Sequence, residues 1–187
     1  MNTQYHSPAL STDLFPRWVE SLRDQTKVLI RPITAADRDM ERGFIEALSP
    51  ESRRFRFLGQ MRSPSEALLT QLTVLDPVHQ VAFAAVVAGA GGETLIGVSR
   101  FSTDATGGIC ECAVTVAEDW QCRGVGTLLM NHLIAIARSR GIKYMYSIDD
   151  ARNTKMHELA RHLGFTSRVD TLDTRQVIHE LHLFAGG

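Results

Sequence analysis

Hydrophobic residues recur along this chain with two spacings, one typical of amphipathic helices and one typical of buried strands. Over residues 14–22 the spacing is helical, and it predicts a short helix within an N-terminal extension that covers residues 1–25. From residue 26 onward, apolar runs of strand length alternate with segments of helical period. Strands are predicted in that part of the chain at residues 27–32, 81–88, 94–101, 109–116, 143–148, 165–169 and 177–183.

Capping signals predict where helices begin between these strands. Thr34 and Asp37 have the spacing of a capping box, so a helix is predicted to follow the first strand. Ser63 precedes Pro64, and proline is favoured at the first helical position because its missing N–H group would have no partner there. Another helix is therefore predicted to begin at Pro64.

The second half of the chain carries two further predicted helices. Apolar residues at helical spacing cover residues 125–137 and residues 153–163, and a glycine closely follows each segment. The chain shows neither an internal repeat nor a linker. The order of elements therefore predicts one α/β domain with a mixed sheet over residues 26–187.

Composition and charge narrow the classes of function. The 187 residues include 44% hydrophobic residues, enough for a sizeable core, and the formal net charge is −1. A general nucleic-acid binder would carry a strong excess of lysine and arginine, so no nucleic-acid partner is expected. Four arginines nevertheless lie close together, at positions 53, 54, 56 and 62. A solvated helix face is the favoured interpretation of these arginines, and a phosphate-binding patch is the alternative.

The cysteines and the chain start bear on metal sites and location. Cys110, Cys112 and Cys122 are too few for a disulfide framework, and no second cysteine pair or histidine stands at the spacing of zinc ligands. The first residues lack the basic start and apolar run of a signal peptide, and no apolar stretch approaches the roughly 18 residues of a membrane span. We therefore expect a soluble cytoplasmic protein with free thiols, no metal and no membrane partner.

Residues 113–127 carry the most informative pattern: a strand, a short loop with two glycines, and a helix N-terminus. The first N–H groups of such a helix have no internal partners, and the helix dipole adds partial positive charge there. Gly124 and Gly126 remove the side chains that would keep a phosphate away from these groups. The pattern predicts an anion-binding site, and a plain turn before a helix is the alternative.

Two common nucleotide-binding motifs do not match this loop. The dinucleotide motif G-x-G-x-x-G would need glycine where Leu129 stands, and the P-loop sequence Gly-Lys-Ser/Thr is absent. The spacing Gln121-x-x-Gly124-x-Gly126 instead resembles the pyrophosphate-binding pattern of the GNAT superfamily of N-acetyltransferases.

The resemblance covers roughly residues 27 to 170. Residues 28–37 resemble the first strand and helix entry of that superfamily, and residues 153–165 resemble its later motif that ends in Leu-Gly-Phe. With the run at residues 48–53, the chain looks most similar to the acetyltransferase domain of bacterial protein-lysine acetyltransferases.

The resemblance implies the GNAT fold, a central mixed and mostly antiparallel twisted sheet of about six or seven strands flanked by helices. It also implies a V-shaped splay between two central strands, which holds acetyl-CoA as the co-substrate. Amides of the glycine-containing loop would cradle the pyrophosphate, and strand backbone and a helix asparagine would contact the pantetheine arm. The implied acetyl-CoA-binding residues are Val114, Thr115, Val116, Gln121, Cys122, Arg123, Gly124, Val125, Gly126, Thr127 and Asn153.

A general base is expected because an amine must be neutral to attack a thioester. Lysine, with a pKa near 10.4, is neutral in only about one molecule in 2,500 at pH 7, and a positioned base contributes about 10²–10⁴-fold. Glu111 lies on the face of its predicted strand opposite Cys110 and Cys112, and the resemblance implies that a carboxylate on this strand is the base. An exposed glutamate paired with a basic neighbour is the alternative. An N–H group near Val116 would stabilise the oxyanion.

One position departs from the superfamily pattern. Many members carry a tyrosine seven residues after the asparagine to protonate the departing thiolate, and Ala160 stands there in this chain. Either the thiolate leaves unaided or another group serves as the proton donor.

The expected function is acetyl-CoA-dependent acetyl transfer to a primary amine, with a protein lysine as the favoured acceptor. A small-molecule amine acetyltransferase and a non-catalytic acyl-CoA-binding regulatory module are the alternatives. No pattern predicts an oligomeric state.

Overall fold

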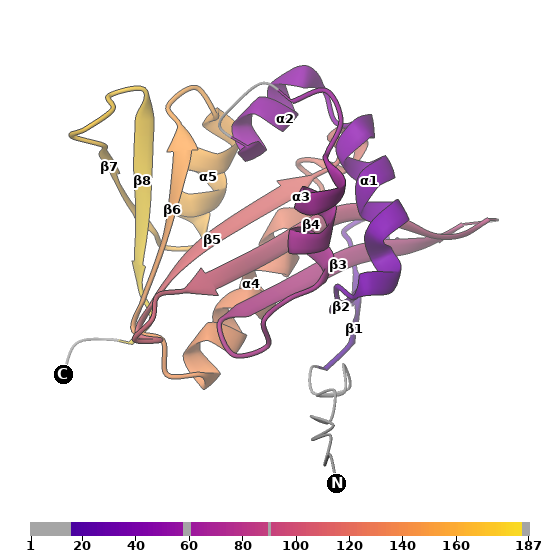
Figure 1. Cartoon of the computed structure of the whole chain (residues 1–187), viewed down its shortest axis with the longest axis horizontal. Helices are drawn as coiled ribbons and strands as arrows, with labels where there is room; N and C mark the ends of the chain where they lie inside the picture. Colours follow the sequence, from indigo (N-terminus) through magenta and orange to yellow (C-terminus); the bar gives the residue numbers. More distant parts are fainter. Residues whose placement is uncertain (1–15, 58–60, 90, 185–187) are drawn as a thin grey trace, which may run out of the picture.

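A computed structural model describes residues 16–57, 61–89 and 91–184, which form one eight-stranded sheet with helices on both faces (Figure 1). The strand order is β1-β2-β3-β4-β5-β6-β8-β7, and every neighbouring pair is antiparallel except the parallel pair of β5 and β6. The mixed, mostly antiparallel sheet is confirmed. The strands are β1 (Trp18–Ser21), β2 (Lys27–Pro32), β3 (Gln80–Gly89), β4 (Gly92–Thr103), β5 (Ile109–Val116), β6 (Tyr144–Asp150), β7 (Thr166–Val169) and β8 (Gln176–His182).

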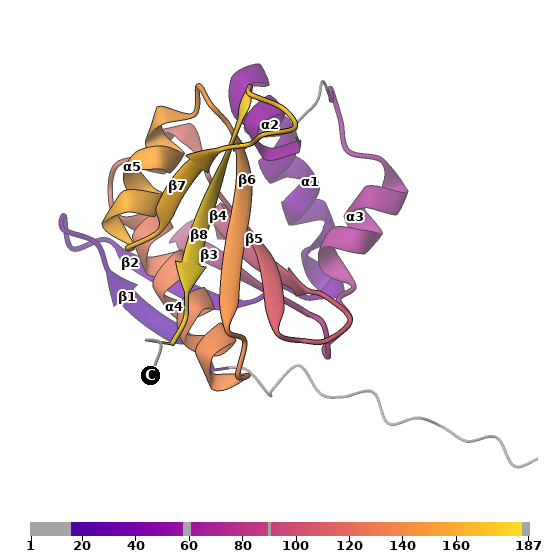
Figure 2. The same ribbon diagram turned by 90° about the vertical axis from the view of Figure 1, so that its left-hand side faces the viewer.

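The helices are divided between the two faces of the sheet, as the view in Figure 2 shows. One face carries α1, α2 and α3, and the other carries α4 and α5. None of the helices in the described part of the chain has the length and hydrophobicity needed to cross a membrane. The helical elements are η2 (Ala35–Asp37), α1 (Arg38–Ala47), α2 (Pro50–Phe57), α3 (Glu66–Thr73), η3 (Glu118–Trp120), α4 (Val125–Ser139) and α5 (Thr154–His162).

Two buried hydrophobic clusters fill the spaces between the sheet and these helices. Phe83 and Leu133 belong to the cluster under α4, whereas Phe44 and Leu69 belong to the cluster under α1 and α3. Residues 81–86 of β3 are all buried, because helices cover both faces of this central strand. The continuous apolar run in the sequence is explained by this double coverage.

The V-shaped splay implied by the resemblance lies between β5 and β6. These strands pair only from Ile109–Glu111 to Tyr144–Tyr146, and beyond that point β5 pairs with β4 alone while β6 pairs with β8. Figure 1 shows the two strands diverging towards their C-terminal ends. The sheet is therefore continuous at one end and open at the other.

The helix predicted over residues 14–22 is wrong in the described part of that range, where Trp18–Ser21 forms the edge strand β1. Positions 14 and 15 lie outside the described residues. Trp18, Glu20 and Leu22 alternate along the strand and face inward, whereas Val19 is 70% exposed. A spacing of four residues between apolar positions fits both a strand and a helix, so periodicity over so short a segment misled the prediction. This strand brings the total to eight rather than the expected six or seven.

Helix α3 begins at Glu66, two residues later than the predicted start at Pro64. Ser65, not Ser63, is the N-cap of α3, and its hydroxyl oxygen accepts a hydrogen bond from the Leu68 N–H at 3.1 Å. The hydroxyl of Ser63 instead donates to a carboxylate oxygen of Glu46 at 2.5 Å. Pro64 has a serine on either side, and both serines are candidate N-caps. Ser63 does not cap the helix because its hydroxyl is bonded to Glu46 of α1.

Candidate acyl-CoA site

The bend between β5 and α4 is built from two residues in the left-handed region of backbone conformation. Cys122 has φ 57° and Gly124 has φ 97°. A Cβ atom added at Gly124 would meet nothing within 4 Å, so the backbone angle, not lack of space, favours glycine there. These residues turn the chain from η3 into the first turn of α4.

The bend leaves a row of backbone donors without partners. Among the hydrogen bonds of the described residues, none is donated by the N–H groups of residues 122–127, and the first in α4 joins Leu128 N to Gly124 O at 3.0 Å. The 15-residue helix α4 adds the positive end of its dipole at the same place. This arrangement can bind a phosphate or pyrophosphate group.

The polar side chains of the bend do not cover these donors. The side-chain amide of Gln121 donates to the Val116 carbonyl at 2.9 Å, and its oxygen accepts from the Lys155 ammonium at 2.5 Å. The Arg123 guanidinium donates to the Asp24 carboxylate in the β1–β2 turn. The Gln121 side chain therefore connects the bend to the end of β5 and to α5 by hydrogen bonds. The spacing of the motif did not indicate this structural role.

Helix α5 lies directly against the first turn of α4. A Cβ atom added at Gly126 would lie 3.2 Å from Leu159 Cδ2 and 3.7 Å from Val116 Cγ2. Asn153 caps α5, and its side-chain oxygen accepts a hydrogen bond from the Met156 N–H at 3.2 Å. The structure thus brings the bend, the end of β5 and the start of α5 together. Direct contact of Asn153 with acetyl-CoA stays a prediction.

The open edge of β5 runs from the bend towards the base of the splay. Residues 112–116 pair with β4 on one side and with no strand on the other. Unpaired backbone groups along a strand edge can hydrogen-bond an extended ligand as an added strand. The predicted pantetheine-binding residues Val114, Thr115 and Val116 all lie on this edge, and the hydroxyl of Thr115 is buried without a partner.

Glu111 lies at the base of the splay, at the last paired position of β5 and β6. It is exposed, opposite Ser102 of β4 and Tyr146 of β6, and the Tyr146 hydroxyl donates to its carboxylate at 3.5 Å. Cys110 and Cys112 point into the core on the other face, so the predicted alternation is confirmed. Burial, followed by the charge of Glu111, raises the pKa of Tyr146. A carboxylate in this position can accept a proton from a bound amine.

A group of charges, in which Glu41 is buried and Arg56 and Arg100 are partly buried, lies on the α1–α3 face near this base. Burial lowers the pKa of Arg56 in α2, against the opposing effect of the carboxylates of Glu41, Glu111 and Asp149. Burial also raises the pKa of Glu41, whose Oε2 atom has no hydrogen-bond partner, and lowers the pKa of Arg100 to about 10. The sequence showed Arg56 only as one of four clustered arginines. The fold places it apart from the other three, in electrostatic contact with the site.

A second polar group joins β6, β7 and β8 beside the splay. Ser147 donates to the Asp149 carboxylate at 2.7 Å, and the fully buried His179 ring contacts the Ser167 hydroxyl at 2.7 Å. Burial raises the pKa of Asp149 and lowers the pKa of His179 to about 4, so the imidazole is neutral at physiological pH. Sequence analysis missed this group because Ser147 and Asp149 of β6 are far along the chain from Ser167 and His179, and strand register alone brings the two pairs together.

The position at which a tyrosine was expected holds no proton donor. Ala160 is fully buried in the core beneath α5. In the part of the chain that the structure describes, no group of three or more histidine, cysteine, aspartate or glutamate side chains is placed to hold a metal ion.

Comparison with known proteins agrees with the acyl-CoA site that the geometry suggests. A family model described as the acetyltransferase (GNAT) family matches residues 45–165. The chain is 48% identical over 166 residues to a Pseudomonas aeruginosa protein named acetyltransferase PA5475, with 89% of each protein covered.

Solved structures share the fold. The GNAT domain of S. lividans PAT matches with a TM-score of 0.81 and 28% identity, over 90% of this chain and 99% of that one. A cAMP-binding acyltransferase from Mycobacterium smegmatis matches with a TM-score of 0.62 and 24% identity, over 91% of this chain. This chain spans 48% of the length of that acyltransferase.

Proposed function

The chain belongs to the acetyltransferase (GNAT) family, and from this premise we propose that it transfers an acetyl group from acetyl-CoA to a lysine side chain on a protein. One observation carries the acetyl-CoA part of the proposal. The unpaired N–H groups of residues 122–127 stand at the dipole end of α4, where the splay between β5 and β6 opens.

The proposed binding mode uses three features of the splay. The diphosphate of acetyl-CoA accepts hydrogen bonds from the bend, as anions do at helix N-termini. The pantetheine arm follows the unpaired edge of β5 at residues 114–116, and Asn153 contacts the arm from the start of α5. Each group then has a partner of matching chemistry, and the thioester is carried along β5 towards Glu111.

The proposed reaction is direct attack of the amine on the thioester. Glu111 takes a proton from the ammonium group, so the neutral nitrogen can form a bond to the carbonyl carbon. An N–H group near Val116 stabilises the negative charge that develops on the carbonyl oxygen. The carbonyl then re-forms as the C–S bond breaks, and coenzyme A leaves as the thiolate without help from position 160, which its modest pKa permits. The nitrogen gives up its second proton to the departing thiolate or to water, which leaves a neutral amide.

A protein lysine is proposed as acceptor on the basis of sequence resemblance. Residues 27–170, with the run at residues 48–53, resemble the acetyltransferase domain of bacterial protein-lysine acetyltransferases. The GNAT domain of S. lividans PAT, at 28% identity, shares the fold on which this proposal depends.

The substitution Glu111→Gln tests the mechanism, because glutamine keeps the shape of the side chain and cannot take the proton. We expect acetyl-CoA binding, measured by calorimetry, to stay intact, and thiol release in the presence of amine to fall by at least about tenfold. Glu158→Gln, at an exposed carboxylate of α5, is the matched control and should leave turnover unchanged. Unchanged turnover in Glu111→Gln would remove this residue from the mechanism.

Ala160 favours a second candidate, a module that binds acyl-CoA without turnover, since it stands where many family members carry the tyrosine acid. The same thiol-release assay separates the two functions. A binding module retains acetyl-CoA and releases no thiol with any amine, whereas a transferase releases thiol in proportion to acetylated product.

A further inference from the structure

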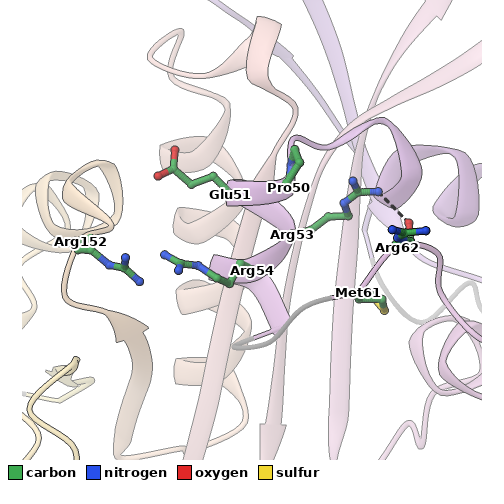
Figure 3. A pocket seen from close by; sticks show the side chains of 7 residues that line it. All are labelled: Pro50, Glu51, Arg53, Arg54, Met61, Arg62 and Arg152. Atoms are coloured by element: carbon green, nitrogen blue, oxygen red, sulfur yellow. Dashed lines mark hydrogen bonds between the residues drawn. The ribbon is translucent and has the colours of Figure 1, made fainter.

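A hollow of about 860 Å³ lies against the outer side of α2 (Figure 3). Arg53 and Arg54 of α2, Arg62 of the following loop and Arg152 of the β6–α5 loop line it, together with Glu51. The whole chain has a formal net charge of −1, so this concentration of arginine is local. Three of the four clustered arginines, for which a solvated helix face was the favoured interpretation, therefore line a concave site.

The positive charges of the hollow are only partly compensated. Arg54 and Arg152 share the carboxylate of Asp150, at 3.4 Å and 2.9 Å. The Arg53 guanidinium donates to the backbone carbonyl of Arg62 at 2.8 Å, and its Nε atom is buried without a partner.

Arg62 itself forms no salt bridge with any residue that the structure describes. Four guanidinium groups therefore stand against two carboxylates, those of Glu51 and Asp150, which leaves a net charge of +2 around the hollow. Arginine is well suited to bind carboxylates, because its planar donors match both oxygens.

The hollow lies on the face of the sheet from which Glu111 is reached. Alternate residues of a strand share a face, and Arg100, two residues from the β4 partner of Glu111, contacts Glu41 of α1 and the Leu72 carbonyl of α3. Glu111 therefore faces the side covered by α1, α2 and α3, whereas α4 covers the opposite side. An amine that gives its proton to Glu111 must approach from the side of the hollow.

Helix α2 connects the hollow to the base directly. It lies over the splay and contacts both β5 and β6. Arg56 of α2 is in electrostatic contact with Glu111, and Arg54, two residues earlier, reaches Asp150 at the open end of β6. Residues two apart project from roughly opposite sides of a helix, so a chain segment bound beside Arg54 is separated from the base by about the width of α2 and can reach it around the helix.

We propose that the hollow binds acidic residues flanking the acceptor lysine, so the acceptor is a lysine within an acidic segment of a protein. This inference rests on the proposed function and specifies its acceptor. Net positive charge at the hollow, on the side from which the amine approaches, disfavours polycationic acceptors such as polyamines and aminoglycosides.

The test compares two short peptides with a single lysine, one flanked by glutamates and one by glutamines. We expect the acidic peptide to have the lower KM, and this preference to weaken as ionic strength rises. Arg62→Gln and Arg152→Gln should each raise the KM of the acidic peptide about 1.5- to fivefold, the range of a solvent-exposed ion pair. The KM of the neutral peptide and the dissociation constant of acetyl-CoA should not change. Arg161→Gln, at an exposed arginine of α5, removes the same charge away from the hollow and is the matched control.

Each other outcome overturns the inference in a recognisable way. Equal KM values for the two peptides would show that the hollow does not bind acidic flanks, although the proposed function would stand. Weaker acetyl-CoA binding in Arg62→Gln would show that the hollow holds a phosphate of the co-substrate instead. Acetylation of free acidic amino acids, without either peptide, would replace the protein segment by a small anionic amine. If no amine releases thiol, the proposed function fails, and calorimetric binding of the two peptides still decides the inference.

Discussion

Gly97 of β4 provides a sharp test of how the sheet positions the acetyl-CoA site. A Cβ atom added there would lie 3.0 Å from Leu129 Cδ1, 3.3 Å from Val125 Cγ1 and 3.2 Å from the backbone oxygen of Thr115. Val125 and Leu129 belong to the first turns of α4, immediately after the bend with the unpaired N–H groups. The absence of a side chain at Gly97 therefore allows α4 to lie close to the sheet.

The substitution Gly97→Ala should destabilise the protein by overpacking. The side-chain ends of Leu129 and Val125 can shift, but the Thr115 carbonyl belongs to β5, which is paired with β4 and cannot move independently. Extra atoms in a packed interior typically cost about 1–3 kcal/mol. In a chain of this size each kcal/mol lowers the melting temperature by about 2–4 °C, so we expect a decrease of about 2–12 °C.

The same substitution should weaken acetyl-CoA binding, because displacing the first turn of α4 moves the bend relative to β5. Thermal unfolding and calorimetric titration at a temperature where the variant is fully folded measure the two effects separately. Gly43→Ala is the matched control, since this glycine is exposed in α1 and an added Cβ would meet nothing within 4 Å. That control should gain about 0.5–1 kcal/mol of stability.

Two results would refute this reasoning. A melting temperature of Gly97→Ala equal to that of the unsubstituted protein would mean that the close packing of α4 on β4 is unimportant. A lower melting temperature with unchanged acetyl-CoA affinity would mean that the position of α4 on the sheet does not control the conformation of the bend.

Two further predictions concern buried charge. Burial lowers the pKa of His179 from 6.5 to about 4. Between pH 6.5 and pH 4 the imidazole is therefore protonated in the unfolded chain but not in the folded protein. Stability should therefore fall by about 1.4 kcal/mol per pH unit from about pH 6.5 down to pH 4, a total of about 3 kcal/mol. Urea unfolding of His179→Gln at pH 7 and pH 5 should lack this component, and an unchanged pH slope would contradict it. Asp37→Asn should cost about 3–5 kcal/mol, because it breaks a largely buried pair in which Arg31 donates to Asp37 at 2.8 and 2.9 Å. Thermal unfolding measures that loss, and a change below about 1 kcal/mol would show that the contact of Arg31 with Glu93 is sufficient.

Local patterns in the sequence were enough to identify several elements of the fold. Thr34 and Asp37 form the predicted capping box, and the helix that follows ends at Ala47. The alternation that separated Glu111 from its neighbouring cysteines is present in β5. Such features depend on residues within a few positions of one another, where the periods of helix and strand constrain the chain directly.

Short or ambiguous segments were decided by distant contacts. Trp18 lies in a strand because its ring packs against Phe83 of β3 and stacks on His132 of α4, with centroids 5.3 Å and 4.0 Å away. No pattern within residues 14–22 carries that information. A helix and a strand were both compatible with its spacing, and tertiary packing selected the strand.

The sequence by itself determined the glycine-containing bend, its place before a long helix and the face occupied by Glu111, because each follows from neighbouring residues. Only the tertiary structure decided which side chains surround that carboxylate. Arg56 from α2, and Tyr146 and Asp149 from β6, are brought to Glu111 at the splay by strand register and helix packing. Interactions between charges depend on distance in space, and in this protein the fold sets that distance over separations of up to about a hundred residues.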